Sequence, residues 1–164
     1  MSQSNVNAEW FRERWSIPEG GRVAHLFPNK GWATEHAACR DARDPMAFTT
    51  IAPAETRRCS VCARIERLCL RLLSTGETGC WALPYREWSD KPLSANRTEY
   101  LPKNTKQHWY PGRADGLPSG CGRHVLSIED IDPTNACPAE YQCNTCRRYA
   151  NATDDILYLY RCTV

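Results

Sequence analysis

Apolar residues recur at helical spacing in one segment of the chain, from Ser60 to Ser74. Residues three and four positions apart lie on one face of a helix, so this pattern predicts an amphipathic helix with one buried face. Gly76 and Gly79 follow and are expected to end it. The apolar face consists of Ile65, Leu68, Cys69 and Leu72, and another face carries a basic stripe of Arg64, Arg67 and Arg71.

A second, shorter helix is predicted near the N-terminus, from Ala8 to Ser16. It places three large aromatic residues, Trp10, Phe11 and Trp15, on or near one face. We expect this aromatic strip to dock on the first part of the chain; docking on a partner protein is the alternative. The sequence Pro18-Glu19-Gly20-Gly21 follows and ends the element.

Strand patterns are short. Residues 22–27 predict a strand, and residues 34–40 predict its antiparallel return, so the two form a hairpin. Residues 151–155 are expected to interrupt a helix, which leaves the apolar and aromatic run of residues 156–160 as a terminal strand. The expected fold class is therefore α+β, with two small tandem zinc-stabilised modules. Each module has a hairpin and a C-x-x-C knuckle, and a helix follows the first knuckle.

Composition and turn residues suggest how the chain is divided. A polar, proline-containing stretch with little periodicity separates the two halves and predicts a connection between them. Each half is close to the size at which an apolar core alone is marginal. The predicted divisions are an N-terminal arm with a short helix (1–20), a first zinc module (21–83), a linker (84–107) and a second zinc module (108–164).

Histidine and cysteine residues form the same pattern twice, with 13, 19 and 2 residues between successive members in the first copy and 12, 21 and 2 in the second. Three thiolates and one imidazole suit a tetrahedral Zn²⁺. Because four protein donors fill the coordination shell, the expected zinc is structural and not catalytic. The candidate ligands are His25, Cys39, Cys59 and Cys62 in the first set, and His108, Cys121, Cys143 and Cys146 in the second.

Net charge and export signals limit the remaining function classes. The formal charge is +2, from 21 basic and 19 acidic residues. Each filled site adds a local charge of about −1, so a general attraction to nucleic acid is not expected. No apolar run approaches the ~20 residues of a membrane span, and residues 1–8 lack an apolar signal region. We therefore expect a cytoplasmic protein without membrane contact.

The ten cysteines can in principle form disulfides or bind metal. A reducing compartment favours metal binding. The four cysteines outside the two sets, Cys69, Cys80, Cys137 and Cys162, are expected to be free thiols that pack like small apolar residues.

The order His, Cys, C-x-x-C, with the turn Cys121-Gly122-Arg123 and the run Cys146-Arg147-Arg148, resembles small zinc-finger proteins of actinobacteria and their phages. The resemblance covers residues 25–65 and 108–149. It implies two bound Zn²⁺ ions and a phage-encoded protein.

The first module also resembles a WhiB-like regulator, in residues 37–45, in the knuckle at residues 59–62 and in the turn at residues 76–81. In that family four cysteines hold a [4Fe–4S] cluster, and a glycine turn containing Trp engages the primary sigma factor. The resemblance implies a cluster on Cys39, Cys59, Cys62 and Cys69. His25 competes with Cys69 for the fourth position, and only His25 has a counterpart in the second module, which favours zinc.

These observations predict a non-catalytic metal-binding regulator that binds a host protein, with the primary sigma factor or RNA polymerase as the first candidate. The contact residues would be Trp81, Arg64, Arg67 and Arg71. One alternative is a zinc-finger protein that binds nucleic acid through those arginines. The other is a degenerate HNH-like zinc nuclease, in which His124 would activate water beside residues 132–135.

Overall fold

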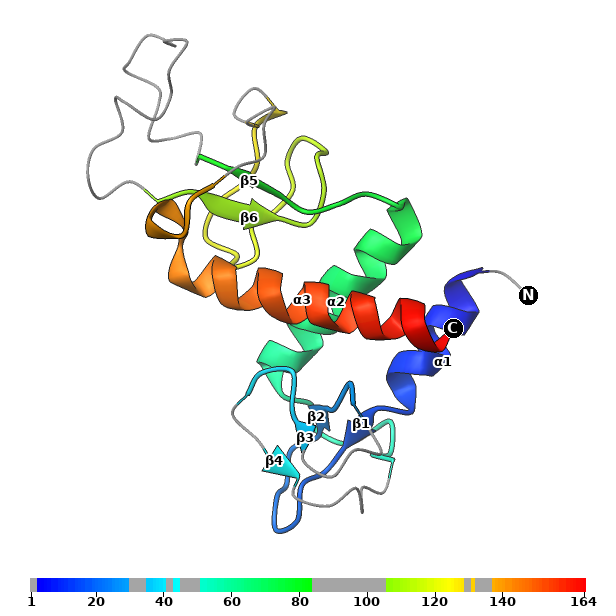
Figure 1. Cartoon of the computed structure of the whole chain (residues 1–164). Helices are drawn as coiled ribbons and strands as arrows, with labels where there is room; N and C mark the ends of the chain where they lie inside the picture. Colours follow the sequence, from blue (N-terminus) through cyan, green and yellow to red (C-terminus); the bar gives the residue numbers. More distant parts are fainter. Residues whose placement is uncertain are drawn as a thin grey trace, which may run out of the picture. The chain divides into compact units, whose positions relative to one another are not determined.

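The computed structural model describes residues 3–29, 35–40, 43–44, 51–83, 106–128, 131 and 137–164. The chain divides into two compact units, residues 1–75 with 151–164 and residues 76–150, and each is described by itself. The elements, coloured along the chain in Figure 1, are the helices α1 (Gln3–Arg12), α2 (Ser60–Thr75) and α3 (Asn144–Thr163), the 3₁₀ turn η3 (Ala139–Tyr141), and the strands β1 (Trp15–Ser16), β2 (His25–Leu26), β3 (Glu35–His36), β4 (Arg43–Asp44), β5 (Cys80–Ala82) and β6 (His108–Tyr110).

The fold is α+β, as predicted. Among the described residues, the strands form three antiparallel pairs, β1 with β2, β3 with β4 and β5 with β6. The predicted pairing of residues 22–27 with residues 34–40 is wrong, because β2 pairs with β1 and β3 pairs with β4. Among the described residues of the two predicted partners, one backbone hydrogen bond joins them, from the Ala38 amide to the Leu26 carbonyl at 2.8 Å. The chain turns at residues 38–39, so a longer ladder cannot form.

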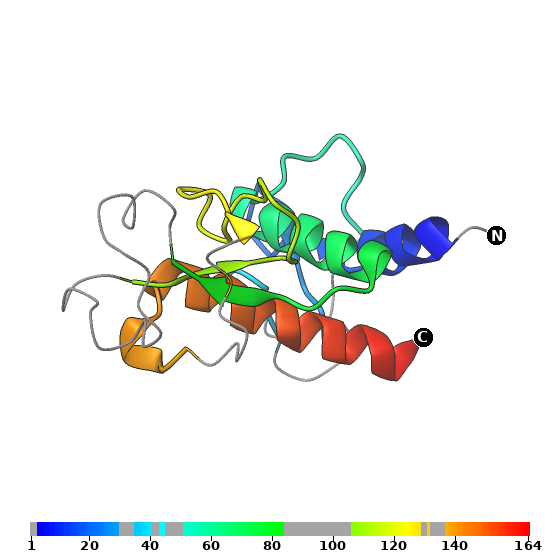
Figure 2. The same ribbon diagram turned by 90° about the horizontal axis from the view of Figure 1, so that it is seen from above.

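Helix α2 is the centre of the first unit. Its four predicted apolar positions, from Ile65 to Leu72, are all buried, which confirms the amphipathic pattern. Gly76 follows α2 with φ of +69°, a conformation that glycine adopts without steric cost. Three large side chains, Phe11, Trp15 and Phe27, are completely buried in the same unit. α1 packs against α2 (Figure 2).

The N-terminal helix lies earlier than predicted. α1 ends at Arg12, and Trp15 belongs to strand β1. The predicted docking of the aromatic strip on the first module is confirmed for Trp15, whose Nε1 donates to Glu66 Oε1 at 3.0 Å. Trp10, 7 % exposed, packs on the end of α3 instead, where its Nε1 donates to Thr163 Oγ1 at 2.8 Å. Trp10 also contacts Tyr160 edge-on, with ring centroids 5.4 Å apart.

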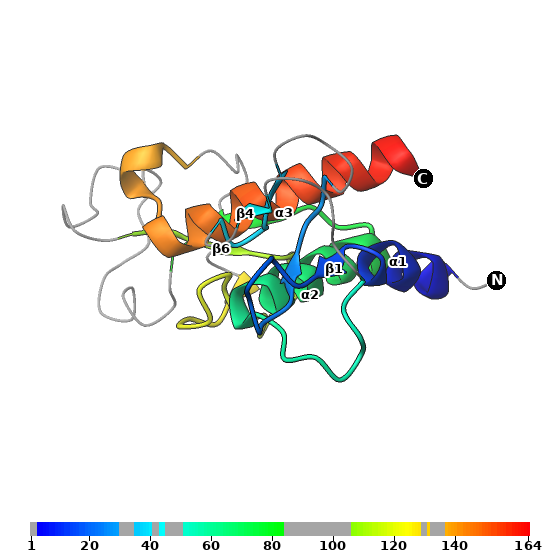
Figure 3. The same ribbon diagram turned by 90° about the horizontal axis from the view of Figure 1, so that it is seen from below.

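The predicted terminal strand at residues 156–160 is wrong. These residues belong to α3, which continues without interruption through residues 151–155 (Figure 3). The buried side chains recur every three or four residues, at Ala150, Thr153, Ile156 and Tyr160. This helical face is buried, and burial outweighs the β-propensity of the aromatic and branched residues.

The second unit is built around the β5–β6 pair. Trp81 lies opposite Trp109 in the ladder, and Ala82 lies opposite His108. Gly79 precedes β5 in close contact with the Trp109 ring. The core of this unit consists of Cys80, Ala82, Tyr110, Leu117 and Leu126, with Ile131 packed against it.

The division into units differs from the predicted modules. Residues 151–164 group with the first unit and not with the second. Most of the predicted linker, residues 84–105, lies outside the described part of the chain. Within the described residues, no helix is both long enough and apolar enough to cross a membrane.

Candidate metal centres

Both predicted ligand sets come together in the structure. His25, Cys39, Cys59 and Cys62 form one group, and the second set forms another. Within each group, the nitrogen and sulfur ligand atoms all lie within 4.8 Å of one another. The chain therefore has the donor chemistry of a metal-binding protein, with two His-Cys₃ groups that could each hold an ion such as Zn²⁺.

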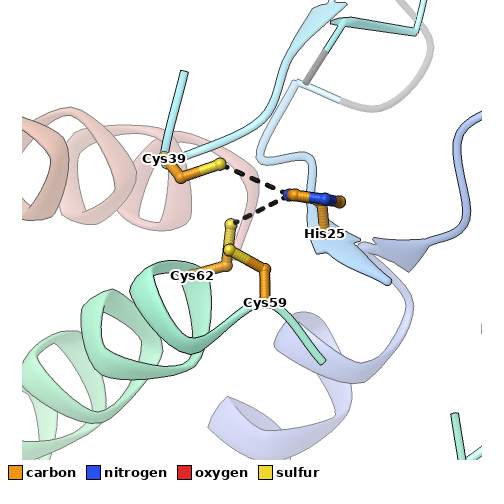
Figure 4. A group of neighbouring side chains, drawn as sticks. All are labelled: His25, Cys39, Cys59 and Cys62. Carbon is orange, nitrogen blue, oxygen red and sulfur yellow. Dashed lines mark hydrogen bonds between the residues drawn. The ribbon is translucent and has the colours of Figure 1, made fainter. Parts of the chain in front are cut away.

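The first site joins three parts of its unit. His25 lies on β2, Cys39 lies in the turn after β3, and Cys59 and Cys62 lie at the start of α2 (Figure 4). The Nδ1 atom of His25 lies 3.3 Å from Cys39 Sγ and 3.9 Å from Cys62 Sγ. The imidazole therefore presents Nδ1 to the site.

The second site has the same arrangement. His108 lies on β6, and Cys143 and Cys146 lie at the start of α3. The Nδ1 atom of His108 lies 3.4 Å from Cys121 Sγ and 3.5 Å from Cys146 Sγ. Each site thus uses the same ring nitrogen of its histidine.

Backbone hydrogen bonds around the two sites are equivalent. In each site the amide of the first knuckle cysteine donates to the carbonyl of the residue before the histidine. A second bond runs to the carbonyl of the residue after the histidine, from the residue before the second ligand. The first kind joins Cys59 to Ala24 and Cys143 to Gln107, both at 2.8 Å, and the second joins Ala38 to Leu26 at 2.8 Å and Gly120 to Trp109 at 2.7 Å.

The repeat extends upstream of the histidines, which sequence reasoning missed. Trp15-Ser16-Ile17-Pro18 matches Trp81-Ala82-Leu83-Pro84. In both cases the Trp lies opposite the residue after the ligand histidine, and the next residue lies opposite the histidine itself. The residue after each Trp also forms an isolated antiparallel bridge to an isoleucine, Ser16 to Ile51 and Ala82 to Ile131. Trp81 therefore occupies the structural position of the buried Trp15.

Burial shifts the pKa values of the ligands. Contact with Cys39 and burial raise the pKa of Cys62 far above its usual range. Burial raises the pKa of Cys146 to about 12, although backbone hydrogen bonds at Trp109 and Cys121 act in the opposite direction. Metal binding at neutral pH must therefore displace thiol protons.

Histidine 108 is held neutral. Burial lowers the pKa of His108 to about 4, and the nearby charges of His124 and Arg123 add to this effect. The rings of His108 and His124 lie 4.0 Å apart between centroids. At neutral pH the imidazole keeps a lone pair for a metal.

The remaining cysteines lie apart from the ligand groups. Cys69 is buried, and its Sγ lies 3.9 Å from the carbonyl oxygen of Thr153. Cys80 is also buried and its thiol donates to the carbonyl of Gly112 at 3.1 Å. Cys137 is half-buried and Cys162 is exposed. All ten cysteines fall within the described residues, and none forms a disulfide there. Cys69 and Cys80 agree with the expected buried thiols, whereas the expected apolar packing is wrong for the exposed Cys162 and only partly met at Cys137.

The predicted contact residues are divided between the two units. Arg67 is exposed, whereas Arg64 and Arg71 are half-buried, all on α2 of the first unit. Trp81 is half-buried in the second unit. Of the nuclease candidates, His124 contacts the ligand His108, and residues 132–135 lie outside the described part of the chain.

Comparisons with family models, curated proteins and solved structures find no match to this chain. Its class is therefore defined by the two His-Cys₃ groups alone.

Proposed function

We propose that the chain is a non-catalytic zinc protein in which two Zn²⁺ ions stabilise the fold. The observation that carries this proposal is the pair of groups with four protein donors each, all ligand atoms within 4.8 Å of one another. Four protein donors complete a tetrahedral shell, so no position is left for water or substrate. In units this small, the free energy of metal binding becomes free energy of folding.

Zinc is favoured over a [4Fe–4S] cluster at the first site. A four-cysteine cluster would need Cys69, whose Sγ lies beside the Thr153 carbonyl instead. His25 occupies the fourth position and faces Cys39 and Cys62. The second site has equivalent backbone hydrogen bonds, and its fourth donor is His108. This equivalence supports the same metal at both sites.

Metal analysis of anaerobically purified protein tests this proposal. We expect two zinc ions per chain and no visible absorption. Cys39→Ser and Cys121→Ser should each reduce the content to about one zinc, because each removes a ligand from a different site. Iron and sulfide in the wild-type protein, lost in Cys69→Ser, would instead establish the cluster.

We further propose that the zinc-stabilised chain acts by binding a protein, with the exposed Arg67 of α2 at the contact. Arg64 and Arg71 lie on the same helix and are partly accessible, so the partner should present an acidic surface. The resemblance to WhiB-like regulators makes an actinobacterial primary sigma factor the first partner to test. A phage-encoded regulator of host transcription is the function that this interaction would serve.

A binding assay with purified sigma factor separates this proposal from nucleic-acid binding. Arg67→Glu should weaken binding at least tenfold, whereas the control Arg22→Glu, at an exposed arginine outside the stripe, should have little effect. Trp81→Ala tests the second predicted contact separately. Absence of sigma binding together with DNA binding that falls steeply with salt would favour the nucleic-acid alternative.

A further inference from the structure

The two metal sites share one backbone scheme, so the places where they differ can be identified residue by residue. The first difference lies directly after the second ligand. The backbone there has positive φ in both sites, 61° at Arg40 and 75° at Gly122. Glycine adopts this conformation without steric cost, whereas an arginine is strained in it. The turn that holds Cys39 is therefore strained, and the turn that holds Cys121 is not.

The second difference lies two residues before the second ligand, where the first site has Ala37 and the second has Ser119. Ser119 is completely buried, and its Oγ lies 3.3 Å from Cys121 Sγ. The same Oγ accepts the backbone amide of His124 at 3.3 Å. A metal-bound sulfur carries no proton, so the Ser119 hydroxyl donates to it. Such a bond to a charged acceptor stabilises the thiolate, and no hydroxyl occupies the Ala37 position.

The third difference concerns the histidines. His108 is 7 % exposed and lies against the His124 ring, whereas His25 is only half-buried. The exposure of the second ligand differs in the opposite direction: Cys39 in the first site is buried, whereas Cys121 in the second site is half-buried and more accessible to solvent. At Cys121 the Ser119 hydroxyl, 3.3 Å from the sulfur, offsets this greater access because its hydrogen bond stabilises the metal-bound thiolate.

We propose that the first site exchanges its zinc and the second retains it, an inference that rests on the proposed zinc-binding function. Over a range of free zinc concentration, the second site stays filled while the first site loads and empties. Cys59 and Cys62 lie at the start of α2, and Arg64 and Arg67 lie within the next two turns. Zinc at the first site therefore holds the first turns of α2 in place, and with them the arginines of the basic stripe. The structure of this part of the first unit then depends on the free zinc concentration.

Chelator competition on the wild-type chain tests this order of release. The zinc-loaded protein is equilibrated with increasing EDTA, treated briefly with iodoacetamide and mapped by peptide mass spectrometry. Alkylation should appear at Cys39, Cys59 and Cys62 at an EDTA concentration about tenfold or more below that needed at the second site. Cys162 is exposed and serves as a labelling control at every concentration.

Exchanging the distinguishing residues tests the cause. Arg40→Gly and Ala37→Ser should each strengthen zinc retention at the first site by about fivefold to tenfold, and Ser119→Ala should weaken the second site by a similar factor. Arg40→Gly also removes a 3.7 Å ion pair with Asp155, but both side chains are well exposed and the pair contributes little. Asp155→Asn removes the pair without changing residue 40 and should leave zinc retention unchanged.

The possible failures are distinguishable. A chain without zinc would overturn the proposed function. Two bound zinc ions that leave together, or a second site that empties first, would overturn only the order of release. If the order is correct but Arg40→Gly and Ala37→Ser leave it unchanged, the assigned cause is wrong.

Discussion

Substitution of Gly79 by alanine should destabilise the second unit by steric overlap. A Cβ atom at this position would lie 2.5 Å from the Cε2 and Cζ2 atoms of Trp109, closer than real Cβ contacts. The ring has little room to retreat, because Trp109 is 3 % exposed. A Cβ at Gly120 would also approach the same ring, at 3.1 Å. Overpacking against a confined ring costs typically 1–3 kcal/mol, and we expect about 3 kcal/mol here.

The overlap should also affect the second metal site. Trp109 follows His108, and its carbonyl accepts the Gly120 amide at 2.7 Å in the turn before Cys121. Displacement of Trp109 therefore disturbs two ligands, and Gly79→Ala should lower zinc retention at the second site. The first site should be unaffected, because its four ligands belong to the other unit.

Denaturant unfolding of the zinc-loaded protein measures the cost, with Gly76→Ala as the matched control. Gly76 has φ of +69° and no atom within 4 Å of an added Cβ, so its substitution imposes conformational strain without overlap. We expect a loss of about 1 kcal/mol for Gly76→Ala. If Gly79→Ala costs no more than this control, the proposed confinement of Trp109 is wrong.

Three further predictions concern other parts of the chain. Trp15→Phe should lower the free energy of unfolding in urea by about 2 kcal/mol, because it removes a partly buried hydrogen bond to the Glu66 carboxylate at 3.0 Å. Trp81→Phe should cost less, because Trp81 is half-buried whereas Trp15 is fully buried, and an equal cost would contradict this reasoning. Burial lowers the pKa of His108 to about 4 in the folded metal-free protein, whereas its ordinary value is 6.5. Between these two pH values the unfolded chain therefore protonates this histidine and the folded chain does not. Its unfolding free energy, measured in EDTA, should decrease between about pH 6.5 and 4, and a decrease unchanged in His108→Gln would refute this assignment. Tyr160→Ala should cost about 3 kcal/mol, since the side chain packs in the first unit; a neutral substitution would contradict the helical placement.

The eight candidate ligands could be found in the sequence because cysteine, histidine and their spacing are discrete features. The order of types repeats, and two residues between knuckle cysteines suffice to bring both sulfurs to one ion. The amphipathic pattern of residues 60–74 was likewise sufficient for α2, whose buried face agrees residue by residue. Both inferences depend on residue types and on their spacing along the chain, which folding does not change.

The upstream part of the repeat was present in the sequence but hard to detect. Trp15 and Trp81 begin similar tetrapeptides, yet the two are separated from their histidines by very different lengths of chain. Strand pairing brings each Trp opposite the residue that follows its histidine, whatever the length between them. The interpretation of Trp81 depends on this equivalence, because its counterpart Trp15 is buried in the first unit.

The sequence by itself determined which side chains can bind metal, how often the pattern occurs and where α2 lies. Only the tertiary structure decided that β2 pairs with β1 and that residues 156–160 are helical. Strand partners are distant in sequence, and a short run such as Ile156-Leu157-Tyr158-Leu159-Tyr160 suits either element locally. Burial of one helical face, against Trp10 among others, selects the helix. The strain at Arg40 also became visible only in the folded backbone, where the turn requires positive φ.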